Sequence, residues 1–119
     1  MRTLIIAAGL GLLFGLPAGA QEKTRAASFA KDVLPILKAS CGKCHTGAGS
    51  KAGVDLSTYA AMKKGAKSGP VFVEGDPNKS PLVTSISGDK PDMPKKAAPL
   101  AKKQVEVIAA WVKEGAKNN

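Results

Sequence analysis

A single histidine, two cysteines and five aromatic residues are all that this sequence of 119 residues contains of those types. One histidine excludes bis-histidine ligation of a metal within the chain, and it leaves no second imidazole for acid-base catalysis. Five aromatic residues, with Phe14 in an apolar leader, are too few for a base-stacking platform, so nucleic acid is not an expected partner. A small domain with so few rings also has little to fill its own core.

The sequence also lacks an apolar run long enough to span a membrane. Residues 4–16 are apolar, but a spanning helix needs roughly 20 residues. Arg2 precedes this run, and Ala18, Gly19 and Ala20 supply the small-x-small pattern of a cleavage site. We therefore expect no stable membrane insertion after cleavage, with an uncleaved anchor as the alternative. The predicted organisation is a cleaved signal peptide at residues 1–20, a short polar lead at residues 21–27 and one domain at residues 28–119.

Apolar residues at helical spacing predict an all-α fold. A first helix is expected to begin after Ser28 as N-cap and to end near Ser40, because the apolar residues between Phe29 and Leu37 share one helical face. Pro35 lies inside this segment and removes a backbone hydrogen bond. We therefore expect a kink, or a short turn before the helix proper.

The clearest predicted helix is the last one. Val105, Ile108, Ala109 and Val112 follow the i, i+3, i+4, i+7 pattern, and Gly115 ends the segment. Between the first and last helices we expect a short helix from the N-cap Ser57 to Gly65, an extended piece at residues 71–73, a short helix over residues 81–86 after Ser80, and an irregular loop stiffened by prolines at residues 87–99.

Both cysteines and the only histidine fall in one pentad, Cys41, Gly42, Lys43, Cys44 and His45. This spacing is the attachment motif of c-type haem. Two thiols three positions apart can each bond one haem vinyl group, and the next imidazole then faces the iron from the same side. The pentad therefore predicts one covalently attached haem c, with Cys41 and Cys44 as thioether residues and His45 as the proximal iron ligand.

Three other interpretations of the pentad are weaker. A structural disulfide would leave the adjacent histidine unexplained. A thioredoxin-like redox pair would be expected at the start of a helix in a βαβ setting, whereas this pair follows a predicted helix and strands are nearly absent. A zinc site would have two cysteines and one histidine, and it would need a carboxylate or water as fourth ligand.

The sixth iron ligand has two candidates after the leader, Met62 and Met93. Met62 stands at helical spacing from Leu56 and Tyr59, where methionine is usually core filler. Met93 stands between prolines in a loop without hydrophobic periodicity, where a long apolar side chain has no packing reason to be. The contrast favours Met93 as the distal ligand and leaves Met62 as the alternative.

The chain resembles small monohaem c-type cytochromes (class I-like), and it is similar to the domains described as planctomycete-type cytochrome c. The resemblance extends over about residues 29–116; the pentad is its most specific part. The other residues that carry it are Phe29, residues 33–37, Asp55, Leu56, Gly75, Asp76, Pro77, Ser80, Pro81, Leu82, Met93, Pro94, residues 108–112, Gly115 and Ala116.

This resemblance implies a small helical bundle wrapped around one haem, with the first and last helices crossing and the methionine of the Met93-Pro94 pair as distal ligand. Two positions depart from the family pattern. Lys95 stands where a second proline is frequent, and Ala101 stands where a serine or threonine often caps the last helix. The missing cap should cost that helix about 1 kcal/mol and leave function unchanged.

The expected function is that of a soluble periplasmic electron-transfer protein and not of an enzyme. With His45 and Met93 both on the iron, no position is open to substrate, and methionine ligation raises the reduction potential. The alternatives are a haem enzyme or gas or redox sensor with an open distal site, and an electron-relay subunit of a larger oxidoreductase complex.

Acidic residues are scarce, and the formal net charge is +9. A basic rim could steer acidic docking surfaces of redox partners such as a terminal oxidase or a dehydrogenase, in transient encounters. A merely solvated surface is the equally weighted alternative. The lysines expected near the haem are Lys43, Lys63, Lys64, Lys67, Lys90, Lys95, Lys96, Lys102 and Lys103.

Overall fold

The computed structural model describes Gly11, Gly15 and residues 26–119. The predicted signal peptide, apart from those two glycines, and most of the predicted lead therefore lie outside the described residues. Within the described part of the chain every regular element is helical and no strand is present, as the all-α prediction requires. The elements are η1 (Phe29–Val33), α1 (Leu34–Ser40), η2 (Lys51–Gly53), α2 (Tyr59–Lys64), η3 (Pro77–Lys79), α3 (Pro81–Thr84) and α4 (Lys102–Lys113).

The first helical segment changes type between Val33 and Leu34, just before Pro35, where the sequence predicts a kink or a short turn. The Ser28 hydroxyl accepts a hydrogen bond from the Lys31 N–H, and η1 then runs as a π-turn in which the Leu34 N–H donates to the Phe29 carbonyl. Pro35 stands in the first turn of α1, where a missing N–H costs little. The wider turn before it accommodates a ring that a continuous α-helix would force against the preceding carbonyl.

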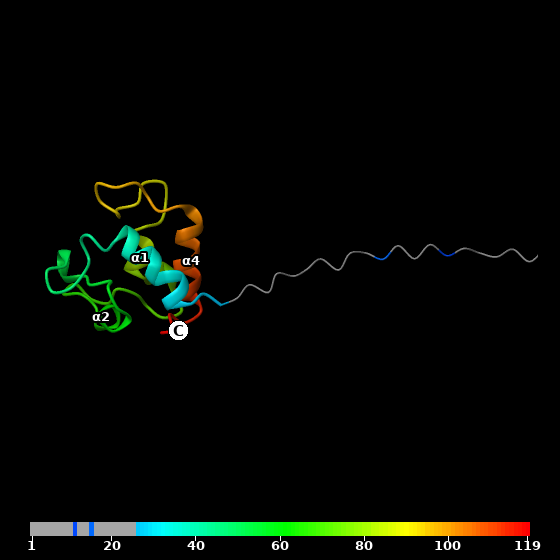
Figure 1. Ribbon diagram of the computed structural model, residues 1–119, viewed down its shortest axis with the longest axis horizontal. Helices are drawn as coiled ribbons and strands as arrows, with labels where there is room; N and C mark the ends of the chain where they lie inside the picture. The colour runs from blue at the N-terminus through cyan, green and yellow to red at the C-terminus, as the bar shows by residue number, and fades with distance from the viewer. Residues whose placement is uncertain (1–10, 12–14, 16–25) are drawn as a thin grey trace, which may run out of the picture.

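Helix α4 buries one face and packs against η1. Ile108, Trp111 and Val112 are fully buried, and the Trp111 ring lies 5.4 Å from the Phe29 ring between centroids. Phe72 and Tyr59 complete a cluster around Trp111, at 5.3 and 6.3 Å. The η1 segment that α4 contacts is the first part of the cyan helical segment in Figure 1. The few aromatic residues of the domain are thus gathered in one cluster.

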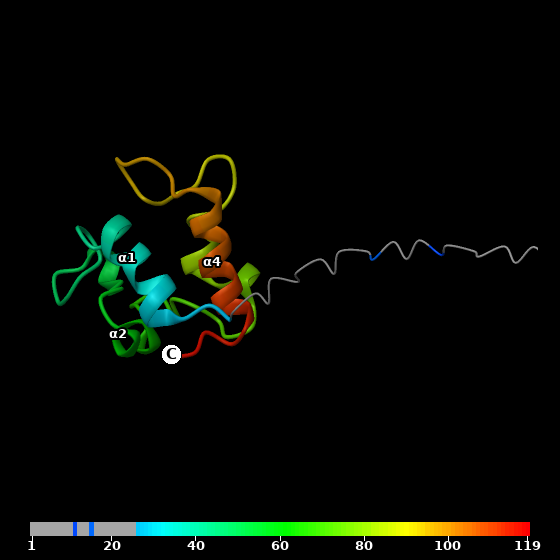
Figure 2. The same ribbon diagram turned by 45° about the vertical axis from the view of Figure 1, so that its right-hand side comes forward.

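Asn119 is hydrogen-bonded to the first residues of η1. The Asn119 side chain accepts a hydrogen bond from the Phe29 N–H at 2.8 Å, and its backbone oxygen accepts one from the Ala30 N–H at 3.0 Å. These bonds satisfy N–H groups that the first turn of a helix leaves without an intrahelical partner. In Figure 2 the C-terminus lies near α2, while the loop between α3 and α4 is at the opposite end of the domain.

Two local predictions are wrong in detail. Thr58, not Ser57, caps α2, because the Thr58 hydroxyl accepts from the Ala61 N–H while the Ser57 hydroxyl is bonded to Asp55. Helix α3 ends at Thr84 instead of residue 86. Residues 71–73, expected as an extended piece, belong to no regular element, and the Leu82 N–H donates to the Val71 carbonyl at 2.9 Å.

Ser80 locks the turn that leads into α3. It is fully buried; its hydroxyl accepts from the Val73 N–H at 2.8 Å and lies 2.8 Å from the Asp76 carbonyl. We expect Ser80→Ala to lower the free energy of unfolding by about 1–3 kcal/mol, because it removes the acceptor of the Val73 N–H and a donor to the Asp76 carbonyl at a fully buried position. Denaturant unfolding would measure this. Thr84→Ala, at an exposed site on α3, should stay within about 0.5 kcal/mol of the parent; equal losses in both variants would contradict the prediction.

Candidate haem site

The pentad continues the course of α1 as a tight turn. Cys41 caps α1, its N–H donating to the Leu37 carbonyl at 2.8 Å, and the His45 N–H donates back to the Cys41 carbonyl at 3.0 Å. Gly42 permits this path: a Cβ atom there would lie 2.6 Å from the Lys38 carbonyl oxygen, closer than side chains tolerate. The turn therefore brings Cys41 and His45 together and leaves Cys44 exposed.

The His45 ring is oriented by a single backbone contact. Its Nδ1 lies 3.0 Å from the Val54 carbonyl oxygen, and the Leu56 N–H donates to the His45 carbonyl at 2.8 Å, which holds the two stretches side by side. A carbonyl only accepts, so Nδ1 carries the proton and Nε2 keeps its lone pair. This is the tautomer and the outer contact that a metal-binding histidine needs.

A cavity of about 300 Å³ opens beside His45. Its walls come from Cys41 and His45, from Val54 and Leu56, from the turn around residues 66–71, from α3 and the residues flanking it, and from Met93. Most of the lining side chains are apolar, as a cofactor pocket requires. A largely apolar macrocycle carrying iron suits such walls. The Cys41 thiol and one imidazole nitrogen line the cavity, and Cys44, which is not part of the lining, is exposed in the same turn.

The two candidate methionines are separated clearly by the fold. Met93 is half-buried and lines the cavity together with His45; its N–H donates to the Ser85 carbonyl at 2.9 Å, which ties the proline-rich loop to the end of α3. Met62 is 1% exposed, belongs to the hydrophobic core and lines a different hollow beside Phe72. Of the two thioethers, only that of Met93 belongs to a residue lining the same cavity as His45.

Both cysteines are free thiols, with no disulfide between them. Cys41 lines the cavity, and burial raises the pKa of its thiol, so the group is protonated near neutral pH. In the described residues no cluster of three or more His, Cys, Asp or Glu side chains is placed to hold a metal ion. The side chains in the cavity lining that suit haem iron are the His45 imidazole and the Met93 thioether.

Sequence reasoning missed three contributors to the cavity: the Val54 carbonyl, the Ser85 carbonyl and Lys79. Backbone acceptors carry no sequence signature, so the first two follow only from the chain path. Lys79 stands between two segments that carry the family resemblance, Asp76 and Ser80, yet it was not among the lysines expected near the haem. Its position beside Ser80-Pro81, at the start of a predicted helix, is the signal that could have included it.

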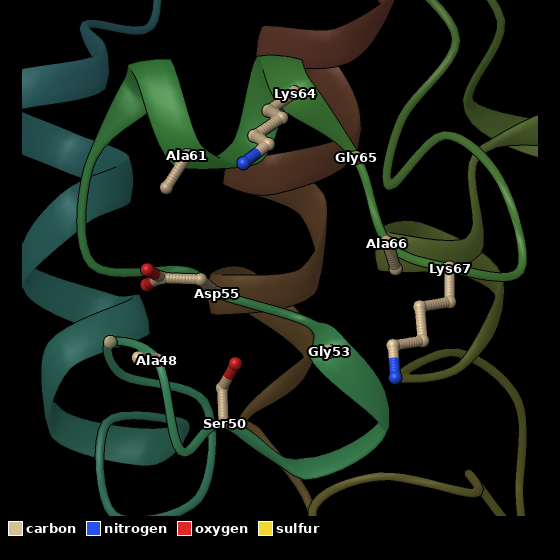
Figure 3. A pocket seen from close by; sticks show the side chains of 10 residues that line it. Ala48, Ser50, Gly53, Asp55, Ala61, Lys64, Gly65, Ala66 and Lys67 are labelled. Carbon is tan, nitrogen blue, oxygen red and sulfur yellow. The ribbon is translucent and has the colours of Figure 1, made fainter.

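A second and larger hollow, of about 510 Å³, lies between residues 47–55 and α2 (Figure 3). Its lining consists of glycines and alanines with Ser50, Asp55, Lys64 and Lys67, and no His, Cys or Met. The Ser57 hydroxyl and N–H donate to the Asp55 carboxylate and lower the pKa of that group. Side-chain chemistry and not volume therefore favours the cavity beside His45 as the candidate haem site, because the hollow in Figure 3 is lined by no imidazole, thiol or thioether.

The pentad, the oriented imidazole and the apolar cavity are features expected of a c-type cytochrome domain. Residues 41–96 match the family model described as planctomycete cytochrome C, so the resemblance inferred from the sequence is confirmed. The matched segment runs from the pentad through Met93 to Lys96. No curated protein and no solved structure matches the chain significantly. Cytochrome c domains carry haem c and transfer electrons, which fits a carrier rather than an enzyme.

In the part of the chain that the structure describes, no helix has the length and apolar character needed to cross a membrane.

Proposed function

We propose that this protein is a periplasmic electron carrier with one haem c, attached through Cys41 and Cys44 and ligated by His45 and Met93. One observation carries the proposal: an imidazole whose Nδ1 is held by the Val54 carbonyl lines the same apolar cavity as a thioether from a distant loop. Haem, when bound, supplies one-electron iron chemistry.

The chain's own residues orient the ligands and exclude water. The Val54 carbonyl fixes the tautomer of His45 and increases the basicity of Nε2. The Ser85 carbonyl holds the backbone of Met93, so the thioether needs little further ordering to serve as a ligand. Apolar walls from Leu56, Leu82 and Ile86 lower the local dielectric, and burial together with methionine ligation favours the reduced state.

The proposed partners are redox proteins with acidic docking surfaces, such as a terminal oxidase or a dehydrogenase. All nine lysines of the expected rim are exposed, and Lys63 among them is paired with Glu74. Positive side chains on one domain accelerate its association with an acidic surface of a partner protein. They contribute less to the lifetime of the complex that forms. Covalent haem attachment needs reduced thiols and a maturation system that works outside the cytoplasm. The proposed location is therefore periplasmic.

The test is the visible spectrum of protein purified from a periplasm competent in haem attachment. We expect sharp reduced bands, a weak ferric band at long wavelength from methionine bound to iron, and no change on adding carbon monoxide. Rapid carbon monoxide binding with a high-spin spectrum would instead indicate a haem enzyme or sensor. Protein without a haem spectrum under these conditions would exclude the proposal.

A further inference from the structure

Lys79 is the only lysine or arginine among the residues that line the haem cavity. The other polar side chains of the lining are the two hydroxyls of Ser68 and Ser85 and the pentad groups of Cys41 and His45. A carboxylate bound at this edge of the cavity would find no other positive charge among the lining residues. Because burial of an unpaired charge is costly, Lys79 is the residue able to compensate such a carboxylate.

The backbone beneath Lys79 is held firmly. Lys79 ends η3, and its N–H lies 3.2 Å from the Asp76 carboxylate, which caps this short helix. The next residue is Ser80, fully buried and hydrogen-bonded to Val73 and Asp76. The position of the Lys79 Cα at the cavity edge is therefore set by the fold, and only the side chain has freedom.

The amine itself is weakly engaged. Its Nζ lies 3.7 Å from the Asp76 Oδ2, and the Lys79 side chain is 77% exposed. Exposed pairs at this spacing contribute little, since water screens them and two side chains must be ordered. The second Asp76 oxygen is already used in capping η3. The Lys79 amine can therefore leave the Asp76 carboxylate for a stronger anionic partner at little cost in free energy.

A c-type haem brings its own carboxylates, the two propionates on one edge of the macrocycle, and these resist burial unless they are paired. We propose that Lys79 binds a haem propionate, as a positioning residue that compensates its charge at the cavity edge. This inference rests on the proposed function, because it needs a haem in the cavity beside His45. A lysine near a propionate also raises the reduction potential, since the uncompensated carboxylate stabilises ferric iron.

The experiment compares four holoproteins: parent, Lys79→Gln, Lys79→Arg and Lys113→Gln. Lys113 is exposed in the last turn of α4 and does not line the cavity, so its variant reproduces the loss of net charge alone. The readouts are the propionate bending bands in the resonance Raman spectrum and the midpoint potential at low and at high salt. We expect Lys79→Gln to shift the propionate bands and to lower the potential more than Lys113→Gln does, with the difference reduced at high salt. Lys79→Arg should restore both readouts.

Identical bands and potentials in the two glutamine variants would overturn the inference. Low-spin haem spectra in all four proteins would show, in that case, that the proposed electron carrier still stands. A parent protein that attaches no haem would instead remove the proposed function and the inference together.

Discussion

Replacing His45 with alanine should abolish the low-spin haem spectrum and reduce the recovered haem protein by more than about tenfold, since loss of even an outer contact to a metal ligand costs 10–100-fold in affinity. The chain contains no other histidine to take its place. The apolar cavity would then lose the imidazole that binds the iron, and with it the haem that fills the cavity. The haem content per protein, from absorption of purified periplasmic fractions, measures the effect.

A matched variant separates ligation from structural support. His45→Asn keeps an amide N–H able to donate to the Val54 carbonyl, which accepts from Nδ1 at 3.0 Å in the parent, but it lacks the imidazole Nε2. If His45 is the ligand, His45→Asn behaves as His45→Ala. A parent-like spectrum in His45→Asn would contradict the ligand role and leave the histidine with a loop-bracing role only.

Met93→Ala should open the distal position. We expect loss of the weak long-wavelength ferric band, a lower midpoint potential because methionine ligation raises it, and rapid binding of carbon monoxide to the ferrous protein. The haem should remain attached, because Cys41, Cys44 and His45 are unchanged. Absorption spectra with and without carbon monoxide, together with a redox titration, check all three effects.

Met62→Ala is the natural control for Met93→Ala. Met62 is 1% exposed in the core, so its truncation should cost about 2–5 kcal/mol of stability through transfer and cavity terms. Its spectrum and carbon monoxide response should match those of the parent. The reverse pattern, with an open iron in Met62→Ala and a closed one in Met93→Ala, would assign the distal ligand to Met62.

The sequence by itself determined what depends on neighbouring positions. The haem-attachment motif could be recognised without knowledge of the fold, because its residues Cys41, Cys44 and His45 lie within one stretch of five positions. The family match over residues 41–96 agrees with that prediction. The first and last helices were predictable because Ser28 caps one and a 3.6-residue apolar period marks the other. The change of helix type before Pro35 likewise follows from a missing N–H, a property of that residue alone.

Only the tertiary structure decided what depends on segments far apart in the chain. The sequence pattern favoured Met93 over Met62 as the distal ligand. Only the path of the folded chain places Met93 in the cavity lining and Met62 in the hydrophobic core. The proton on His45 is assigned by the Val54 carbonyl, and Lys79 reaches the cavity edge through the turn that Ser80 locks. Backbone acceptors look alike in every sequence, and a side chain's environment is made by whatever packs against it. Those contacts form only when the chain folds.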